Sequence, residues 1–356
     1  MRQGIFFEMQ AGSIFLNMKK LDKKKEKKLG GNRLLDDAGN QLPKPLQDPN
    51  RDSVQAGLIS VIIPTYNEAA TIDSLFRSIA PLYLDGAELI FCDGGSTDGT
   101  AERIKALAAR LAAWAEEKRK SDASEKRQKE SDVQGTAGRA AKAQEKRGPA
   151  AAEWKAQKIR HAQSAADRGA NEQKKLCPVK VMTAAHKGRA WQMNEAADCS
   201  HGGILFFLHC DSELPKQAAG EIRAVMKRYE AGCFGIDFQE KKNFFLYTCK
   251  WISNHRVKDR KVMFGDQGIF MKRELFYRAG KYQELPIMED YQLSLTLKAM
   301  RVPYGMTKHR IFTSTRRFQG NTVQKLRVMW QMNRLRAAYR RGVPIGEIAA
   351  QYRDIR

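Results

Sequence analysis

The sequence predicts an α/β fold with a mostly parallel sheet, and two observations carry that prediction. Apolar runs at 58–63, 89–92 and 204–208, rich in β-branched and aromatic residues, have the length and continuity of strands buried on both faces. The first two runs are each followed by a turn and then by apolar residues at helical spacing. This repeated order of strand, turn and helix is typical of a parallel sheet covered by helices.

The remaining elements continue the same alternation along the chain. Apolar spacing predicts helices around 72–79 and 100–111, and over 189–198, 216–230, 320–341 and 344–353, with one more opening at 288–290. Short apolar runs predict further strands at 179–182, 233–238 and 265–271.

Two segments interrupt the alternation because they carry few large apolar side chains. Residues 17–57 combine lysine runs with Gly, Asn, Asp and Pro, and residues 116–175 are rich in Ala, Lys, Glu, Gln, Arg and Ser. Such compositions bury too little apolar area to offset the entropy of ordering. We therefore expect a disordered basic tail over 1–57, a domain over 58–319 that 116–175 interrupts as a disordered or solvated helical insertion, and a basic helical extension over 320–356.

The net charge of the 356-residue chain is +23, which suggests a nucleic-acid partner until its distribution is considered. Residues 1–57, 116–175 and 300–356 carry net charges of +4, +6 and +11, which leaves +2 for the rest. The excess therefore belongs to the appendages, and the sequence has no helix-turn-helix, zinc-finger or aromatic-basic sheet signature. We expect no nucleic-acid partner.

The cysteines and the apolar content bear on the cellular compartment. The six cysteines show no C-x-x-C spacing, so they indicate neither a zinc ribbon nor a redox motif and fit a reducing cytoplasm. No run of about 18 apolar residues exists that would predict a transmembrane helix. The N-terminus makes a poor signal peptide because polar residues break its apolar stretch.

Acidic side chains follow several of the predicted elements at the edge where ligands bind in open α/β sheets. Asp93 follows the second strand, Asp211 the fourth, and Glu289 and Asp290 come at a later turn. Each has a simpler interpretation as a turn or helix cap, or as charge at a helix N-terminus. Their joint occurrence beside glycine turns instead indicates a hard divalent cation with a phosphate-bearing ligand.

The ordered set of motifs resembles the family 2 inverting glycosyltransferases of the GT-A fold. The motifs are Pro64-Thr65-Tyr66-Asn67-Glu68, the glycine-rich stretch from Asp93 to Thr100, a strand ending in an acidic triplet, and Glu289-Asp290. Gly188-Arg189-Ala190-x-Gln192-Met193-Asn194, Gly265-Asp266-Gln267-Gly268 and Met288-Glu289-Asp290 are similar to a bacterial subgroup, the radical-SAM/selenodomain-associated transferase 2 proteins. The resemblance covers about 58–115 and 176–353.

The resemblance implies a role for each matching position. Pro64, Tyr66 and Glu68 would line the nucleotide pocket, and Asp93 would hydrogen-bond the base. Arg189 would lie near the diphosphate, while Asp266 and Gln267 would face the sugar or the acceptor. Asp290 would be the general base that deprotonates the acceptor hydroxyl, supported by Glu289.

The resemblance also implies a Mn²⁺ or Mg²⁺ ion that bridges the diphosphate of the nucleotide-sugar donor, a UDP-sugar being the expected one. The acidic triplet departs from the family pattern because His209-Cys210-Asp211 stands where Asp-x-Asp is usual. Asp211 is the expected ligand. His209 either ligates Mn²⁺ as a softer donor, faces the ribose or is packed.

The basic C-terminal region adds two expectations. Arg317, in Arg316-Arg317-Phe318, resembles an arginine-aromatic motif near the diphosphate and acceptor. The helix over 320–341 combines an apolar stripe with basic flanks, which suits the surface of an anionic membrane and a lipid or isoprenoid acceptor. The alternative is a helix that packs on the core and presents a solvated basic face.

Two other functions remain as alternatives. A nucleotidyltransferase shares this architecture but wants a glycine-rich loop with Arg and Lys near the first strand, and 64–68 has neither. A basic nucleic-acid-binding protein is the second, and the segregated charge argues against it.

Overall fold

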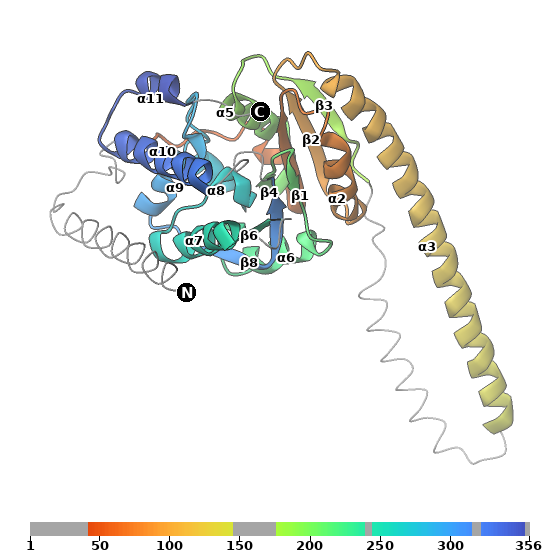
Figure 1. Cartoon of the computed structure of the whole chain (residues 1–356). Helices are drawn as coiled ribbons and strands as arrows, with labels where there is room; N and C mark the ends of the chain where they lie inside the picture. Colours follow the sequence, from red (N-terminus) through yellow and green to blue (C-terminus); the bar gives the residue numbers. More distant parts are fainter. Residues whose placement is uncertain (1–41, 145–175, 239–243, 315–321, 353–356) are drawn as a thin grey trace.

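A single mixed sheet of eight strands forms the centre of the molecule in the computed structural model, which describes residues 42–144, 176–238, 244–314 and 322–352 (Figure 1). The strand order is β3–β2–β1–β4–β7–β6–β8–β5. The strands are β1 (Gln55–Thr65), β2 (Glu88–Asp93), β3 (Lys180–Thr183), β4 (Gly202–Phe207), β5 (Ser212–Glu213), β6 (Ala231–Phe238), β7 (Ile269–Lys272) and β8 (Tyr304–Thr313). The predicted α/β class is confirmed.

Six of the eight strands run in one direction. β1 pairs in parallel with β2 and β4, β2 pairs in parallel with β3, and β6 pairs in parallel with β8. β7 lies antiparallel between β4 and β6, and β5 is antiparallel to β8. The carboxyl ends of β1, β2, β4, β6 and β8 therefore meet at one edge of the sheet, which we call the carboxyl-end rim.

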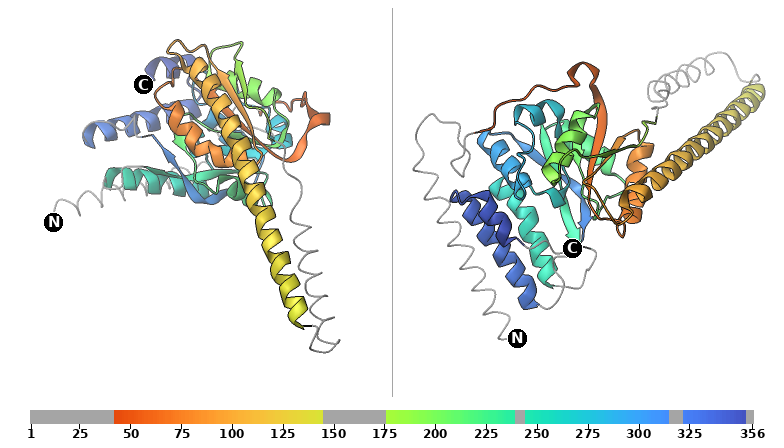
Figure 2. Two further views of the ribbon diagram at one scale, coloured as in Figure 1. Left: turned by 90° about the vertical axis from the view of Figure 1, so that its right-hand side faces the viewer. Right: turned by 90° about the horizontal axis from the view of Figure 1, so that it is seen from above.

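Helices cover both faces of the sheet (Figures 1 and 2). One face packs Ile63, Phe91 and Phe206 with α2 and α3, and the other packs Ile62 and Phe207 with α5, α8 and α9. Adjacent residues of one strand reach opposite cores because successive side chains alternate across a strand. The helices are α2 (Ile72–Leu84), α3 (Thr100–Gln144), α5 (Arg189–Asp198), α6 (Ala218–Met226), α7 (Phe244–Arg260), α8 (Arg273–Arg278), α9 (Glu289–Ala299), α10 (Thr322–Arg340) and α11 (Ile345–Gln351), with 3-10 turns η1 (Arg51–Ser53) and η2 (Gly265–Gln267).

The helix α3 is partly core and partly a projecting arm (Figure 2). Its buried side chains, Ile104, Ala108, Leu111 and Ala115, recur every three or four residues and lie against the sheet. Past that point α3 leaves the body and continues to Gln144. The predicted insertion therefore begins in the middle of a continuous helix, and its residues 145–175 lie outside the described part of the chain.

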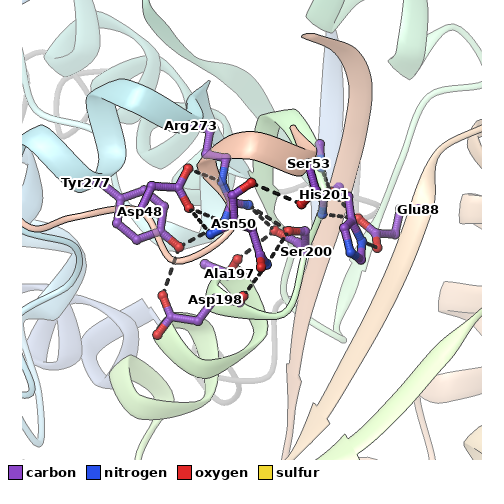
Figure 3. A network of polar contacts seen from close by, with 12 residues as sticks. Asp48, Asn50, Ser53, Glu88, Ala197, Asp198, Ser200, His201, Arg273 and Tyr277 are labelled. Atoms are coloured by element: carbon purple, nitrogen blue, oxygen red, sulfur yellow. Dashed lines mark hydrogen bonds and ion pairs between the residues drawn. The ribbon is translucent and has the colours of Figure 1, made fainter. Parts of the chain in front are cut away.

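The prediction of a disordered linker before residue 58 is wrong for residues 42–57. β1 begins at Gln55, and the segment before it, residues 42–54, forms a strap along the body (Figure 3). Asp48 accepts two hydrogen bonds from the Arg273 guanidinium at 2.6 and 2.7 Å. The Asn50 amide donates to the carbonyls of Asp198 and Ser200. These polar partners come from α5 and α8, so only the tertiary structure reveals the strap.

Several further elements differ from the sequence prediction. The strand expected at 265–271 is divided, because η2 occupies 265–267 and β7 begins at Ile269. The helices α7 and α8 and the strands β5 and β8 were not predicted. The burial of β8 explains the omission: three consecutive exposed residues, 308–310, break its apolar pattern.

Candidate active site

The loops that follow β1 and β2 are joined to each other at the carboxyl-end rim. The Asn67 backbone N–H donates to Ser96 Oγ at 2.9 Å, and the Thr97 N–H donates to Asn67 Oδ1 at 2.9 Å. The Glu68 N–H donates to Thr100 Oγ1 at 2.9 Å. Asn67 has a φ of +53°, a left-handed conformation that asparagine tolerates better than most residues. The sequence motifs at 64–68 and 93–100 thus form one rigid surface.

The buried Asp93 carboxylate binds both loops of this surface through hydrogen bonds. It accepts hydrogen bonds from the backbone N–H groups of Gly95 (3.0 Å) and Ser96 (2.8 Å), from Ser96 Oγ (2.5 Å) and from Thr65 Oγ1 (3.1 Å). Only 3% of the residue is exposed. Its contacts in the structure are therefore those of a loop anchor.

The triplet after β4 lies beside the end of β1. The Cys210 thiol contacts the Pro64 carbonyl oxygen at 3.6 Å, and the Leu208 N–H donates to Ile62 O at 3.0 Å. These contacts bring Asp211 next to the 64–68 loop. Pro64 is buried, and Tyr66, Glu68 and Asp211 are partly exposed at the rim. Glu68 also accepts a hydrogen bond from Thr71 Oγ1 at 2.9 Å.

The helix α5 connects the two halves of the rim. Gln192 Nε2 donates at 2.7 Å to the carbonyl oxygens of both Thr65 and Cys92, at the ends of β1 and β2. Two residues later, Asn194 exchanges hydrogen bonds with the backbone of Tyr282 on the other side, at 2.9 and 3.1 Å. Arg189, at the start of the same helix, forms an ion pair with Glu289. One turn of helix therefore fixes the 64–68 loop relative to α9.

Glu289 and Asp290 lie in the first turn of α9, an end of the helix at which acidic side chains are common. Glu289 is 1% exposed, and Arg189 compensates its charge. Burial disfavours the charged form of Arg189, but the Glu289 and Asp290 carboxylates outweigh it and raise the Arg189 pKa above its ordinary value. Met288, which precedes them, has a φ of +72°, so the turn stores backbone strain beside these carboxylates.

Asp290 is partly exposed, and three elements surround its carboxylate. The Gly265 N–H donates to Asp290 Oδ2 at 2.8 Å. A Cβ atom at Gly265 would lie 2.6 Å from His209 Nε2 and 3.3 Å from Asp290 Oδ2, so the imidazole, the glycine and the carboxylate are close neighbours. Tyr282 is buried near them: burial first, then the Asp290 and Glu289 charges, raise its pKa well above the ordinary value.

The adjacent 3-10 turn η2 places Asp266 and Gln267 beside this group. Gln267 is fully buried, and its Oε1 accepts a hydrogen bond from the Phe264 N–H at 3.1 Å and from Arg256 at 3.3 Å. Asp266 is partly exposed. Among the described residues, no three His, Cys, Asp or Glu side chains gather closely enough to bind a metal on their own.

The helix α10 is fastened directly to α9. Tyr339 Oη donates to Gln292 Oε1 at 2.6 Å, and Arg340 donates to Tyr291 Oη at 2.8 Å. Leu335 and Tyr339 are buried in a small core with Met288, Tyr291 and other residues. The C-terminal helix therefore packs against the element that carries Asp290.

The structure brings most of the predicted site residues to one rim. Pro64, Tyr66, Glu68, Asp93 and Asp211 lie on the side of β1 and β2. Asp290, Glu289, Arg189, His209, Asp266 and Gln267 lie around the start of α9. Arg317 lies outside the described residues. Sequence reasoning assigned no site role to Gln192, Asn194, Tyr282, Arg256 or Arg336; the first two stand in a quoted motif, while the other three carry no local signal.

One comparison with known proteins concerns part of the chain. Residues 60–128 match the family described as Glycosyl transferase family 2. They include the two hydrogen-bonded loops, 64–68 and 93–100, and the buried part of α3. This stretch is therefore similar to family 2 glycosyltransferases, and we call it the family 2 segment.

Curated relatives match over a similarly short stretch. The glucosyl-3-phosphoglycerate synthases of Mycobacterium tuberculosis and Mycobacterium bovis are 49% identical over 63 residues, which is 17% of this chain. The match spans only 19% of the length of those relatives.

Solved structures match over more of the chain at low identity. The mannosyltransferase PcManGT from Pyrobaculum calidifontis, in complex with GDP-Man and Mn²⁺, is 15% identical with a TM-score of 0.42, covering 89% of this chain and 68% of that one. Glucosyl-3-phosphoglycerate synthase from M. tuberculosis, in complex with Mn²⁺, UDP and glucosyl-3-phosphoglycerate, is 15% identical with a TM-score of 0.41, covering 81% of each chain. TarS 1–349 from S. aureus with UDP is 14% identical with a TM-score of 0.41, covering 73% of this chain and 62% of that one.

Proposed function

We propose that this chain is an inverting glycosyltransferase that transfers a sugar from a nucleotide-diphosphate sugar, expected to be a UDP-sugar, to an acceptor hydroxyl. One observation carries the proposal: a partly exposed carboxylate, Asp290, is held by Gly265 at the same rim as the loops of the family 2 segment. A donor on those loops and a base across from them are what direct displacement at a sugar carbon requires.

The loops after β1 and β2 would hold the nucleotide. Pro64, Tyr66 and Glu68 would line the nucleotide pocket, and Asp93, which anchors the 93–100 turn, would hydrogen-bond the base. The surface is rigid before the ligand arrives, which lowers the entropy lost on binding. Arg189 would approach the diphosphate, although its ion pair with Glu289 also positions α9.

A divalent cation fits this rim when it is held jointly by protein and donor. Asp211 offers one partly exposed carboxylate beside the 64–68 loop. Mg²⁺ and Mn²⁺ are commonly bound by one or two carboxylates together with substrate phosphates, so a cluster of three protein ligands is not needed. The cation would neutralise the charge that develops on the leaving diphosphate. His209 lies against Gly265 and Asp290, so it would shape the base more than ligate the metal.

Asp290 would remove the proton from the acceptor hydroxyl. Its carboxylate accepts hydrogen bonds from the backbone N–H groups of Gly265 and Tyr291, which would hold it in position to meet the acceptor hydroxyl. A single displacement inverts the anomeric carbon and requires no covalent nucleophile.

The test separates donor binding from chemistry. Titrate UDP and GDP with and without Mn²⁺, and then measure hydrolysis of UDP- and GDP-sugars. Asp211→Ala should lose the Mn²⁺-dependent part of nucleotide binding. Asp290→Asn should bind the nucleotide normally but turn over about 10²- to 10⁴-fold more slowly, the usual contribution of a general base.

Asp85→Asn is the matched control, because Asp85 pairs with Arg223 at the C-terminal end of α2, away from the rim. It should change neither binding nor turnover. The proposal fails if no nucleotide or nucleotide sugar binds, and the site assignment fails if neither rim variant alters turnover. Transfer of a nucleotidyl group instead of a sugar would favour the alternative, a nucleotidyltransferase.

The finer family position and the cellular location are also proposals. Met288-Glu289-Asp290 and the α5 motif support the transferase 2 subgroup, because they supply the strained turn and the α5 bridge at the rim. None of the six cysteines, all of which lie within the described residues, forms a disulfide, which supports a reducing cytoplasm.

A peripheral membrane contact through α10 is the last proposal. Among the described residues, no helix has the length and apolarity needed to cross a bilayer. The inner side of α10 packs through Leu335 and Tyr339, while Val323 and Trp330 are 72% and 62% exposed. Exposed apolar side chains on a basic helix suit an anionic membrane surface and a lipid or isoprenoid acceptor. Co-sedimentation with phosphatidylserine vesicles should weaken for Trp330→Ser if this contact exists.

A further inference from the structure

Two arginines that the proposed reaction does not use lie together beside the Asp290 carboxylate. Arg256 comes from α7 and Arg336 from α10, about 80 residues apart in the sequence. Their guanidinium carbons lie 4.0 and 5.0 Å from the centre of the same ring, that of Phe264. Phe264 directly precedes Gly265, whose N–H binds Asp290. The tertiary fold therefore places two positive charges on Phe264, the residue next in sequence to the glycine that binds the proposed base, Asp290.

Both arginines are half-buried, and they make few hydrogen bonds in the described part of the chain. Within the described residues, neither Arg256 nor Arg336 makes an ion pair with a carboxylate, and each donates one hydrogen bond to a neutral oxygen, that of Gln267 Oε1 (3.3 Å) or the Met332 carbonyl (3.1 Å). Arg256 Nε is buried and donates to no acceptor in that part of the chain. Leaving a buried donor of a charged group unpaired is costly.

A third donor, Gln267 Nε2, also lacks a hydrogen-bond acceptor among the described residues. Gln267 is fully buried, and its Nε2 has no acceptor among the described residues, while its Oε1 faces Arg256. Burial lowers the pKa of Arg256 to about 10, and the Arg336 charge adds to this effect against the opposing attraction of Asp266. Even so, Arg256 remains charged at neutral pH. The Asp266 and Asp290 carboxylates attract both arginines, yet the Arg256 Nε and Gln267 Nε2 donors have no acceptor among the described residues.

We propose that Arg256 and Arg336, stacked on Phe264 and joined by Gln267 Nε2, bind an anionic group, phosphate or carboxylate, of the acceptor. Planar guanidinium groups recognise such anions through paired charge-assisted hydrogen bonds. An anion bound there lies on the α9 side of the rim, across α5 from the nucleotide loops, so it would hold the acceptor with its hydroxyl near Asp290. This inference rests on the proposed glycosyltransferase function and narrows its acceptor to anionic molecules.

Inorganic phosphate is the probe, because the acceptor itself is unidentified. Calorimetric titration should show that the wild-type protein binds phosphate, both alone and with UDP and Mn²⁺ present. Arg256→Gln and Arg336→Gln should each weaken phosphate binding by about tenfold or more, as expected for the loss of a hydrogen bond from a charged group. Their affinity for UDP with Mn²⁺ should stay within about threefold of the wild type.

Arg334→Gln is the matched control. It removes the same charge from the same helix, α10, as Arg336→Gln, but Arg334 stacks on the exposed Trp330. It should leave phosphate binding unchanged. Thermal unfolding adds a readout for folding: phosphate should raise the Tm of the wild type and of Arg334→Gln, but not that of the two site variants. Because the buried Arg256 Nε donates to no acceptor among the described residues, Arg256→Gln should fold at least as stably as the wild type without phosphate.

Two outcomes would overturn the inference. Phosphate binding that is insensitive to both substitutions, or equally sensitive to Arg334→Gln, shows general electrostatic attraction. Loss of UDP affinity by the same factor as phosphate affinity shows that the arginines serve the donor diphosphate. The proposed function fails separately, because absence of nucleotide binding together with arginine-dependent phosphate binding leaves this anion site in place.

Discussion

Two polar clusters occupy opposite edges of the same sheet, and they are built differently. At the edge where β4 begins, Arg273 is 1% exposed and its guanidinium donates to Asp48, Ser200 and Tyr277, so that each of its nitrogens has a partner (Figure 3). At the carboxyl-end rim, the buried Arg256 Nε donates to no acceptor in the part of the chain that the structure describes. A fully paired cluster serves the stability of the fold, whereas a cluster with spare donors is prepared for a ligand.

The largest expected effect tests the paired edge. Asp48→Asn removes the charge opposite Arg273 and should lower the free energy of unfolding by about 3 kcal/mol at pH 7, the usual cost of leaving a buried charge without its partner. Urea unfolding measures it. Nucleotide binding should be unchanged, and a loss of binding without a loss of stability would contradict the division between the two edges.

The pH dependence of this effect follows from the Asp48 carboxylate. Burial raises its pKa, but the Arg273 and Asn50 hydrogen bonds outweigh burial and hold the pKa below the ordinary value. A lowered folded pKa means that the stabilisation is complete above the pKa of the unfolded chain, about 3.9. The stability difference between wild type and Asp48→Asn should therefore persist down to about pH 4 and disappear as the pH falls through the lowered pKa.

The next effect tests the rim. Gly265→Ala introduces a Cβ that would lie 2.6 Å from His209 Nε2 and 3.3 Å from Asp290 Oδ2. We expect kcat to fall by about 10- to 100-fold, because a small displacement of the base is enough to misalign the reaction. Donor affinity should be preserved, since the nucleotide loops are across α5. Gly346→Ala, at an open position on α11, is the control and should be silent.

A smaller effect is expected in the loops 64–68 and 93–100, which hydrogen bonds join to each other. Asn67→Ala removes the Asn67 Oδ1 acceptor of the Thr97 N–H and places alanine at a φ of +53°. The Kd for UDP with Mn²⁺ should rise about fivefold, corresponding to the roughly 1 kcal/mol of one hydrogen bond. Asn67→Gly relieves the backbone but loses the same bond. If Asn67→Gly binds UDP as tightly as the wild type, the loss of affinity in Asn67→Ala comes from backbone strain and not from the missing hydrogen bond to Thr97.

The smallest effect is expected outside both edges. Replacing residues 116–175 by a short Gly-Ser linker removes the arm of α3 past its last buried residue, Ala115. Turnover and nucleotide affinity should remain within about twofold of the wild type, because distant sites contribute independently. A folded but inactive deletion, measured beside Asp85→Asn, would show that the arm takes part in function.

The predictability of the site differs between its two sides. The nucleotide side could be predicted because each of its two loops carries a short motif: Asp93, for example, accepts hydrogen bonds from Gly95 and Ser96 in its own turn. The hydrogen bonds between the loops, such as that from Asn67 to Ser96, could not be predicted. The acceptor side could not be predicted either, because Arg256, Phe264 and Arg336 stand in ordinary helical or apolar surroundings. Their proposed role depends on the packing of α7 and α10 beside η2, which brings both arginines onto the Phe264 ring. The same holds for the strap, where Asp48 meets Arg273 across 225 residues of chain.

By itself the sequence determined the alternation of strands and helices, the chemistry of the turns after β1 and β2, and the acidic pair Glu289-Asp290. Burial patterns and turn residues are properties of short stretches, so they can be recognised without a fold. Only the tertiary structure decided that α5 joins the two halves of the rim, that His209 lies against Gly265 and Asp290, and that two arginines meet at one ring. Those arrangements depend on contacts between distant segments, which packing selects and which no local pattern records.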